Sequence, residues 1–359
     1  MGCLLLGDAR FGAQDGDGQL TRSPKPLVSP GNAAAHEQLE PVVPDYSSRP
    51  CEGAADLNLL IEIARTNLAE RLPGLTYWHP GDIAWRLAAL DPRAVAANVR
   101  LWSDDRGVAA ATIFEPPLNV EFDICADREV DGPLLDEMLA WAEARRRQLI
   151  ARTNEDVPIA YSMLGEGTLA TVALDSDAAR IAALTGRGYA RVDRHSVRYR
   201  RALSTPIPEV EPPPGMRLRH VTDADLDERM DLHRDAWSVW GPSSANVHAY
   251  RTLRASPVYR EDLDIVLEDA AGRFLSYCIC WADQESGVGI FEPVGTRPLS
   301  TGKGHGRAVL FEGMRRLKAI GMHTALIGTA SVNARALRLY PFCGFEAVDR
   351  EHFYVKQLT

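Results

Sequence analysis

The sequence predicts a mixed α/β fold of two tandem lobes, each a mostly antiparallel sheet flanked by helices. Three observations predict this class. A chain of 359 residues is long for one compact domain and comfortable for two. The segment Ser204–Gly215 holds five prolines in twelve residues, which indicates a stiff linker. The same order of helices and strands is predicted on both sides of that linker.

Composition sets the remaining boundaries. Residues 1–54 are rich in Gly, Pro, Ser and Ala and show no sustained helical or strand periodicity, so we predict a flexible tail. The first lobe then covers residues 55–203, the linker residues 204–215 and the second lobe residues 216–359.

The second lobe begins with a short strand at residues 216–221 and two helices, over Asp223–Trp237 and Asn246–Arg254. Three apolar segments separated by turns then predict an antiparallel meander, at residues 263–269, 273–281 and 288–296. The chain continues as a helix from Gly304 to Ile320, a strand at 323–329, a helix from Asn333 to Phe342 and a strand at 345–355.

The first lobe repeats this order in weaker form. Helices are predicted at 57–72, 82–90, 132–149 and 176–186, and strands at 98–103, 107–115, 119–125, 169–174 and 189–200. A single gapless offset aligns Asp177 through Tyr189 with Asn333 through Phe345. The sequence therefore predicts two diverged copies of one domain.

The bulk chemistry favours a cytoplasmic protein that acts on a small molecule. A formal net charge of −9 argues against a nucleic-acid partner and suits a cationic acceptor. No apolar run is long enough to span a membrane, and the first residues do not form a convincing secretory signal. The six cysteines suggest no disulfide framework, and the histidines show no metal-ligand spacing, so we predict reduced thiols and no metal.

The most informative local feature is the loop Gly302-Lys303-Gly304-His305-Gly306, which runs directly into a helix. Its glycines can adopt positive φ and expose successive amide groups. At a helix N-terminus such amides form a site for a pyrophosphate. An ordinary glycine-rich turn is the alternative. A Rossmann dinucleotide site is disfavoured, because the loop follows an antiparallel meander.

A second motif follows about thirty residues later: Asn333-x-x-Ala336-x-x-Leu339-Tyr340-x-x-x-Gly344-Phe345. Together with the glycine loop, it resembles the two hallmarks of the GNAT superfamily of acetyl-CoA-dependent N-acetyltransferases. One position departs from that pattern, because Thr301 stands where the family has Arg or Gln. Lys303, Arg307 or Arg297 are candidates to supply the missing charge.

The resemblance implies acetyl-CoA as cofactor and a central pair of strands that splay apart to admit its pantetheine arm. The strand edge would be Val294, Gly295 and Thr296. The pyrophosphate would bind residues 302–307, which are Gly302, Lys303, Gly304, His305, Gly306 and Arg307. The cofactor would also touch Asn333. We expect the His305 side chain to point outward and to take no part in catalysis.

Transfer to an amine needs a base and an acid. Glu292, just before the strand edge, is the leading base, although a salt bridge would also explain it. Asp283 and Glu285, in a turn expected to be exposed, are weaker candidates. Tyr340 matches the family's general acid, although core packing would also explain a helical tyrosine. Trp237 and Trp240 are candidate walls of the acceptor pocket, with core packing as the alternative.

The first lobe is predicted to be degenerate. Glu129 and Asp131 lie where phosphates would need neutral amides, and Leu184 and Asp177 occupy the positions of Tyr340 and Asn333. This tandem arrangement is similar to that of mycothiol synthase-like acetyltransferases.

The function implied is acetyl transfer to a primary amine of a small molecule, by direct attack through a tetrahedral intermediate. Protein N-termini or lysines are alternative acceptors, and a non-catalytic acyl-CoA sensor or scaffold is the alternative class. The sequence leaves the oligomeric state open and is compatible with a homodimer.

Overall fold

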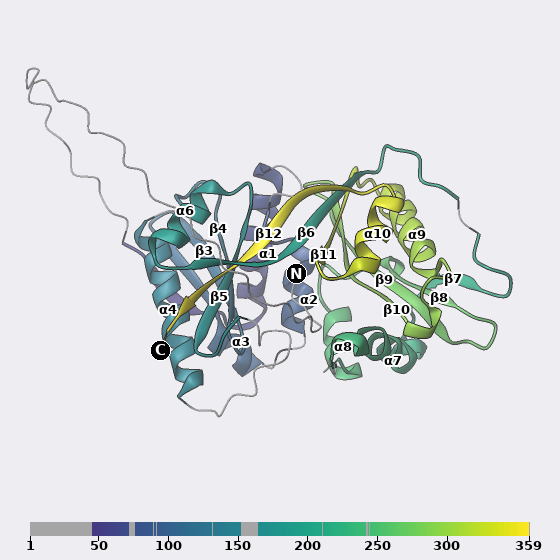
Figure 1. The fold of residues 1–359 in the computed structure, drawn as a ribbon, viewed down its shortest axis with the longest axis horizontal. Helices are drawn as coiled ribbons and strands as arrows, with labels where there is room; N and C mark the ends of the chain where they lie inside the picture. Colours follow the sequence, from purple (N-terminus) through teal and green to yellow (C-terminus); the bar gives the residue numbers. More distant parts are fainter. Residues whose placement is uncertain are drawn as a thin grey trace, which may run out of the picture.

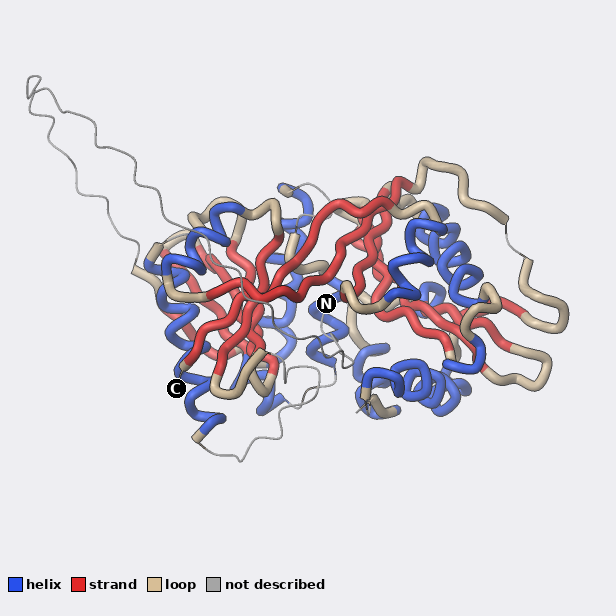
Figure 2. Tube along the Cα trace, viewed as in Figure 1, coloured by secondary structure: helices blue, strands red, loops and turns tan. Residues whose placement is uncertain are grey.

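The computed structural model describes residues 45–71, 76–88, 90, 92–130, 132–151, 164–209, 211–241, 243 and 245–358. Within these residues, one mixed sheet runs through the whole molecule, with helices on its faces (Figures 1 and 2). This confirms the predicted α/β class. The two predicted sheets are joined edge to edge rather than lying as separate sheets.

The N-terminal half contributes the first group of elements. They are β1 (Ser47–Pro50), α1 (Gly53–Glu70), α2 (Pro80–Ala88), α3 (Pro92–Asn98), β2 (Val99–Asp104), β3 (Gly107–Glu115), β4 (Asn119–Ile124), α4 (Pro133–Ile150), β5 (Thr168–Leu174), α6 (Ala178–Gly186) and β6 (Ala190–Ala202).

The C-terminal half contributes the second group, which also includes four short 3-10 helices. Its main elements are β7 (Arg217–His220), α7 (Leu226–Trp237), α8 (Val247–Arg254), β8 (Asp264–Glu268), β9 (Phe274–Asp283), β10 (Val288–Thr296), α9 (His305–Ala319), β11 (Thr324–Ala330), α10 (Ala334–Phe342) and β12 (Glu346–Gln357). The meander β8–β9–β10 is antiparallel, as predicted.

The two halves exchange their last strands. The strand order is β1-β2-β3-β4-β5-β12-β6-β11-β10-β9-β8-β7. Strand β6 therefore pairs with β11 of the C-terminal half, whereas β12 pairs with β5 of the N-terminal half and with β6. Both strands cross the middle of the molecule (Figure 1).

Each half contains a pair of parallel strands that diverge. Strand β10 pairs with β11 from Val288 to Phe291 and no further, although β10 continues to Thr296. In the N-terminal half, β4 pairs with β5 only at Asn119 and Ala170. The expected splayed central pair is thus present in both halves.

Two elements escaped the sequence analysis. Strand β1 lies inside the predicted tail and pairs with β2, and helix α1 begins at Gly53, so the tail prediction is wrong for residues 47–50 and 53–54. Residues 1–44 of the predicted tail lie outside the described residues. Helix α3 was also missed, although Pro92 at its first turn and the alanines after it suit a short helix.

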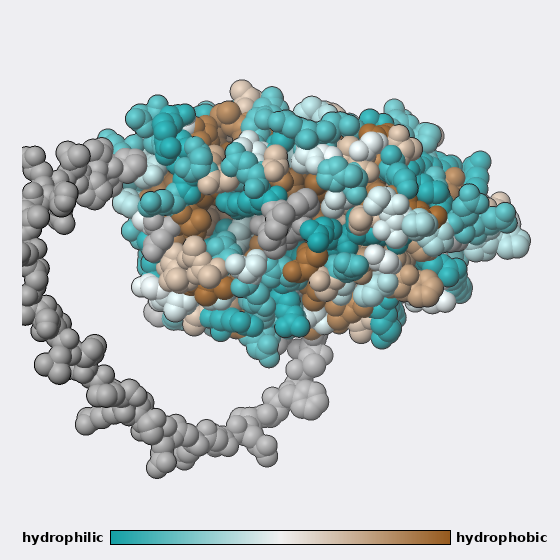
Figure 3. All heavy atoms as spheres, turned by 90° about the horizontal axis from the view of Figure 1, so that it is seen from above, coloured by the Kyte–Doolittle hydropathy of each residue, from teal (hydrophilic) through white to brown (hydrophobic). Residues whose placement is uncertain are grey.

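Apolar side chains pack on both faces of the C-terminal sheet. Helix α9 covers one face, where Gly313 lies so close to Phe291 and Cys280 that a side chain would not fit. Helices α2, α7 and α8 cover the other face. On the molecular face shown in Figure 3, hydrophilic residues predominate and apolar ones are scattered. Among the described helices, none has the length and apolar character needed to cross a membrane.

Candidate active site

A cavity of about 580 Å³ opens where β10, α9 and α10 meet. It is lined by the diverging edge of β10, the glycine loop, one side of α10 and the end of α7. The lining residues are Ala236, Trp237, Val239, Trp240, Val294, Gly295, Thr296, Ser300, Thr301, Gly302, Gly304, His305, Gly306, Arg307, Asn333, Arg335, Ala336, Arg338, Leu339, Tyr340 and Phe342. Five of the candidate residues named from the sequence are absent from this lining: Asp283, Glu285, Glu292, Arg297 and Lys303.

The open edge of β10 forms one wall. After the irregularity between Phe291 and Val294, the strand pairs with β9 through Val294, Gly295 and Thr296, and β11 has already diverged. Gly295 is required here, because any side chain would overlap the Tyr277 ring. The backbone facing the gap can therefore pair with an extended ligand, as a strand would.

The glycine loop adopts the backbone predicted for it. Gly302 and Gly304 have φ of 77° and 82°, and Gly304 is the N-cap of α9. The first amides of an α-helix have no acceptor within the helix, and here they border the cavity. They are suited to a pyrophosphate. Lys303 is exposed and does not line the cavity.

Two expectations near this loop are corrected. The His305 side chain does not point outward: it is buried, lines the cavity, and burial lowers the pKa of its imidazole. Arg297 cannot replace the charge missing at Thr301, because three carboxylates of α7 already bind it at 2.8–3.0 Å. Those carboxylates belong to Glu228, Asp231 and Asp235. Arg297 therefore fastens α7 to the end of β10.

Helix α10 positions Asn333 and Tyr340. The Asn333 side chain accepts a hydrogen bond from the Ala336 amide at 3.2 Å and so caps the helix. Tyr340 is buried, lines the cavity and packs against the rings of Tyr199 and Phe345. Burial, and then the charge of Glu292, raises the pKa of the Tyr340 phenol. Tyr340 is therefore protonated at neutral pH and can donate a proton.

Glu292 has an intermediate exposure and does not line the cavity, and charged side chains of the N-terminal half act on its carboxyl. Burial raises the pKa of its carboxyl, and the charge of Asp82 adds to this effect. Arg86 and Arg198 oppose it. The side chain of Arg86 is almost fully buried and binds Glu121 at 2.6 Å. A polar cluster from both halves thus surrounds the predicted base.

The two weaker candidates for the base, Asp283 and Glu285, differ in burial. Asp283 is buried, contrary to expectation, and its carboxylate accepts a 2.8 Å hydrogen bond from Arg65 of α1. Glu285 is exposed. Neither lines the cavity.

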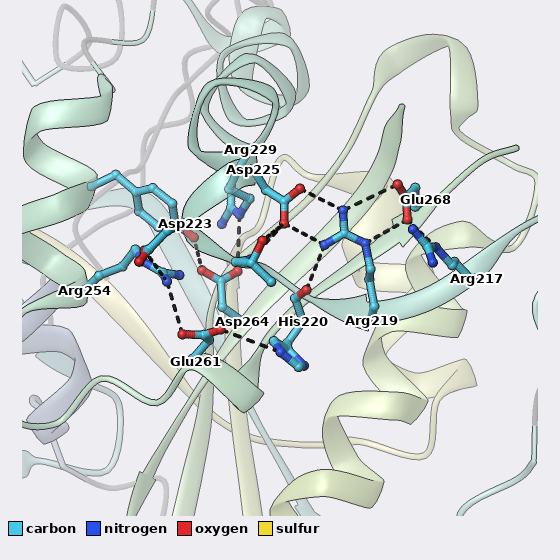
Figure 4. A network of polar contacts seen from close by, with 12 residues as sticks. Arg217, Arg219, His220, Asp223, Asp225, Arg229, Arg254, Glu261, Asp264 and Glu268 are labelled. Carbon is cyan, nitrogen blue, oxygen red and sulfur yellow. Dashed lines mark hydrogen bonds and ion pairs between the residues drawn. The ribbon is translucent and has the colours of Figure 1, made fainter. Parts of the chain in front are cut away.

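Trp237 and Trp240 both line the cavity at the end of α7. The other end of α7 is anchored by charge (Figure 4). Arg219 binds Asp225 at 2.6 Å and Glu268 at 2.7 Å, and the fully buried Arg229 binds the equally buried Asp264 at 3.2 Å. The helix that carries the tryptophan wall is therefore fixed to the sheet.

The equivalent groove of the N-terminal half is filled by its own side chains. The gapless offset places Arg180 of α6 at the position of Ala336 of α10. The Arg180 guanidinium lies 3.7 Å and 3.6 Å from the ring centroids of Tyr77 and Phe122, and donates to the Phe122 carbonyl at 3.2 Å. Phe122 belongs to the diverging part of β4. Arg180 thus covers the edge of β4, whereas the equivalent edge of β10 is open.

The sequence analysis missed a row of cavity residues on α10. Arg335, Arg338, Leu339 and Phe342 follow the three- and four-residue spacing of one helix face. That spacing was visible in the sequence, but two exposed arginines on a helix ordinarily indicate a solvated face. Among the described residues, no group of His, Cys, Asp and Glu side chains converges as a metal site would require.

The open edge of β10, the glycine loop and Tyr340 line one cavity, and comparison with known proteins identifies the class of the domain that holds it. Residues 227–345, about a third of the chain, match the model of the acetyltransferase (GNAT) family. The C-terminal half therefore contains a GNAT acetyltransferase domain. This family comprises acyltransferases that use acetyl-CoA.

Solved structures show the same fold over most of the chain. A GCN5-related N-acetyltransferase from Sphaerobacter thermophilus superposes with a TM-score of 0.60 and 17% identity, covering 87% of this chain and 96% of its own. A tandem GNAT protein from the clavulanic acid biosynthesis pathway gives 0.59 and 13%, covering 88% and 99%. The fold is therefore of the tandem GNAT type.

Curated relatives are mycothiol acetyltransferases. The one from Propionibacterium freudenreichii is 28% identical over 42% of this chain and 51% of its own. The one from Thermobispora bispora is 30% identical over 47% and 58%. The chain thus matches about half the length of these relatives.

Proposed function

We propose that this protein transfers the acetyl group of acetyl-CoA to a primary amine of a small molecule. One observation carries the proposal. The open edge of β10, the glycine loop before α9 and the buried, protonated Tyr340 all line the same cavity. Each of these parts suits one portion of a phosphopantetheine thioester.

The donor would lie along the cavity. Main-chain groups of Val294 to Thr296 would pair with the pantetheine amides, and the amides that open α9 would hold the pyrophosphate. An amide of the β10 edge would also stabilise negative charge on the carbonyl oxygen during attack. Asn333 would contact the donor from the start of α10.

The amine must lose a proton before it attacks. A primary amine has a pKa near 10, so deprotonation at pH 7 costs roughly 4 kcal/mol. Glu292 would accept this proton, directly or through water, because its pKa is raised towards neutrality by burial. The amine nitrogen then forms a bond to the carbonyl carbon and gives a tetrahedral intermediate.

Collapse of that intermediate breaks the carbon–sulfur bond and releases a thiolate. The Tyr340 hydroxyl would supply its proton, since burial keeps the phenol protonated. The products are the acetylated amine and CoA.

The acceptor would approach from the side of Glu292, where Asp82 and Arg86 of the N-terminal half also lie. The excess of acid in the chain, with a net charge of −9, supports a cationic acceptor. The names of the curated relatives add mycothiol-type cysteinyl amines to the acceptors worth testing. The five free cysteines among the described residues support action in a reducing cytoplasm.

The test is thiol release from acetyl-CoA by the full chain, measured with polyamines, aminoglycosides, cysteinyl amines and a lysine peptide. Mass spectrometry of the product should show one added acetyl group on an amine. The second candidate, a non-catalytic acyl-CoA sensor, is favoured by Thr301, which replaces a usual phosphate-binding side chain. Tight CoA binding without release above the hydrolysis background would support that sensor and contradict the enzyme.

A further inference from the structure

Two residues of β10 interrupt its pairing with β9 just before the open edge begins. The register shifts between Phe291 and Val294, so Glu292 and Pro293 form a bulge in the ladder. A bulge bends its strand and changes the direction of the side chains on it. Pro293 has no amide hydrogen, so the Glu292 carbonyl is the only hydrogen-bonding group of the peptide between these two residues. A donor that binds this carbonyl therefore fixes the orientation of that peptide.

The indole of Trp281, on the neighbouring strand β9, is such a donor. Its Nε1 donates a 2.6 Å hydrogen bond to the Glu292 carbonyl oxygen, and its side chain is buried. A buried carbonyl that loses its donor is costly, so this bond holds the peptide in one orientation. The same peptide carries the side chain of the proposed base and leads into the open edge at Val294.

Helix α2 of the N-terminal half packs against β9 and β10 of the other half (Figure 1). A side chain at Gly81 would place its first carbon 2.1 Å from Cγ of Trp281, so only glycine fits between the helix and the indole. The backbone of α2 therefore lies directly on the ring that holds the bulge.

His79 fastens the start of this helix to β10. Its Nδ1 accepts a hydrogen bond from the Gly81 amide at 3.0 Å, and its Nε2 lies 3.3 Å from the Val288 carbonyl oxygen. Because Nδ1 accepts, the proton of the neutral ring is on Nε2, which donates to that carbonyl. Burial lowers the pKa of His79 and so favours the neutral ring. The N-terminal half thus holds the Trp281 indole against the C-terminal sheet.

We propose that Trp281 is a positioning residue for acetyl transfer: its indole N–H fixes the bulge that carries Glu292, and Gly81 of the N-terminal half holds the indole in place. This inference rests on the proposed function, in which Glu292 is the base. A displacement of about 1 Å at a reacting group can cost about 10²-fold in rate. The N-terminal half, whose own groove is filled by Arg180, therefore contributes to the reaction by supporting the backbone of β10.

Trp281→Phe keeps an aromatic ring and removes the donor. We expect kcat to fall about tenfold and the acidic limb of the pH–rate profile to move to lower pH. The limb moves because burial raises the pKa of Glu292, and a carboxyl that leaves this position returns towards its ordinary pKa. The groups that act electrostatically with Glu292 stay in place in this variant: Asp82 and Arg86 of α2, Arg198 of β6 and Tyr340 of α10.

Trp78→Phe is the matched control. Trp78 is as buried as Trp281, and its indole Nε1 has no hydrogen-bond partner among the residues that the structure describes. The control therefore loses the same packing volume without a hydrogen bond and should keep the wild-type kcat and pH profile. A lower rate in Trp281→Phe with an unshifted acidic limb, or an equal change in Trp78→Phe, would overturn the positioning role.

Gly81→Ala tests the contribution of the N-terminal half. The added methyl group must displace the Trp281 ring or α2, so this variant should show the same fall in kcat and the same shift of the limb. Gly186→Ala is its control, because a methyl group there would meet no atom within 4 Å. Titration with CoA shows whether each variant is folded, since the glycine loop is unchanged. A folded Gly81→Ala with the wild-type rate and profile would contradict the role of the N-terminal half.

Failure of this inference and failure of the proposed function give different results. A wild-type chain that transfers no acetyl group to any amine contradicts the proposed function, and the positioning role with it. A wild-type chain that transfers acetyl groups, with a Trp281→Phe variant that keeps both its rate and its pH profile, contradicts the positioning role alone.

Discussion

The indole Nε1 of Trp237 donates a 2.8 Å hydrogen bond to the hydroxyl oxygen of Tyr277. An indole nitrogen can only donate, so the Tyr277 oxygen accepts here and its own proton is free for Nδ1 of His233, at 2.7 Å. The His233 ring in turn contacts Trp85 of α2. A series of side-chain contacts that reaches into the N-terminal half therefore holds one wall of the cavity in place.

Tyr277→Phe removes the acceptor of the Trp237 indole and should loosen this wall. We expect KM for the amine to rise about fivefold, the equivalent of one lost hydrogen bond of about 1 kcal/mol, with kcat little changed. Steady-state kinetics with varied amine, together with the tryptophan emission spectrum, would measure both. Tyr189→Phe, at a buried tyrosine of the N-terminal half that does not line the cavity, serves as control. Unchanged kinetics and emission in Tyr277→Phe would contradict this role.

His233 should make stability depend on pH. Burial, with the charge of Arg229, lowers the pKa of its imidazole from 6.5 to about 3. Its contribution is complete above pH 6.5 and is lost as pH falls, because the unfolded chain then binds a proton that the folded chain refuses. Between pH 7 and pH 4 the loss in unfolding free energy should be about 3 kcal/mol. Denaturant unfolding of His233→Gln should show a shallower decline, and parallel curves for the two proteins would rule the effect out.

Tyr340→Phe keeps the packing of the ring and removes the proposed proton donor. We expect kcat to fall by about 10²- to 10³-fold, with KM for acetyl-CoA nearly constant. Tyr199→Phe is a matched control, because Tyr199 is buried against the Tyr340 ring and does not line the cavity. Equal rates for both variants would remove Tyr340 from the chemistry.

Glu292→Gln tests the proposed base. Because burial raises the pKa of Glu292, activity of the wild-type chain should fall with decreasing pH at a value above the ordinary glutamate pKa of about 4.3. The variant should lose at least about 10²-fold in rate and lose this acidic limb. Glu285→Gln, at an exposed glutamate that does not line the cavity, should keep the wild-type profile. An acidic limb that survives in Glu292→Gln would assign it to another group.

Arg180→Ala tests whether the N-terminal groove is closed by its own side chain. The wild-type chain should bind one equivalent of CoA in calorimetry, and a second equivalent would contradict the assignment of that half. The variant should be less stable by about 2–4 kcal/mol, because it loses two ring contacts and leaves the Phe122 carbonyl unpaired. Arg180→Met, which keeps most of the packing volume, should lose less.

The elements next to the two motifs were predictable within one or two residues. Loop glycines fix the start of α9, and the Asn333 cap with its apolar spacing fixes α10. Each of these signals depends only on residues that are close together in the sequence, so it can be recognised without knowing the fold. The position of Asn333 and Tyr340 on the side of α10 that borders the cavity could be anticipated for the same reason, whereas the burial of the His305 side chain could not.

Contacts between the halves were not predictable in this way. The role of Arg180 depends on two rings far from it along the chain, and the surroundings of Glu292 come from α2 and β6. The order of β6 and β12 was equally inaccessible, because two similar repeats present similar strands to either partner. Helix α3 and strand β1 are too short for periodicity to reveal them.

The order β5-β12-β6-β11 has a consequence for how this molecule can be divided. A cut within the linker at residues 204–215 would separate the chain into two fragments. The N-terminal fragment would carry β6, which pairs with β11 and β12, and the C-terminal fragment would carry β12, which pairs with β5 and β6. Neither fragment could complete its hydrogen bonding alone, so the pair should stay bound after proteolysis and melt in one cooperative transition. The half without an open groove therefore cannot be shed, because its final strand is a structural part of the acetyltransferase domain.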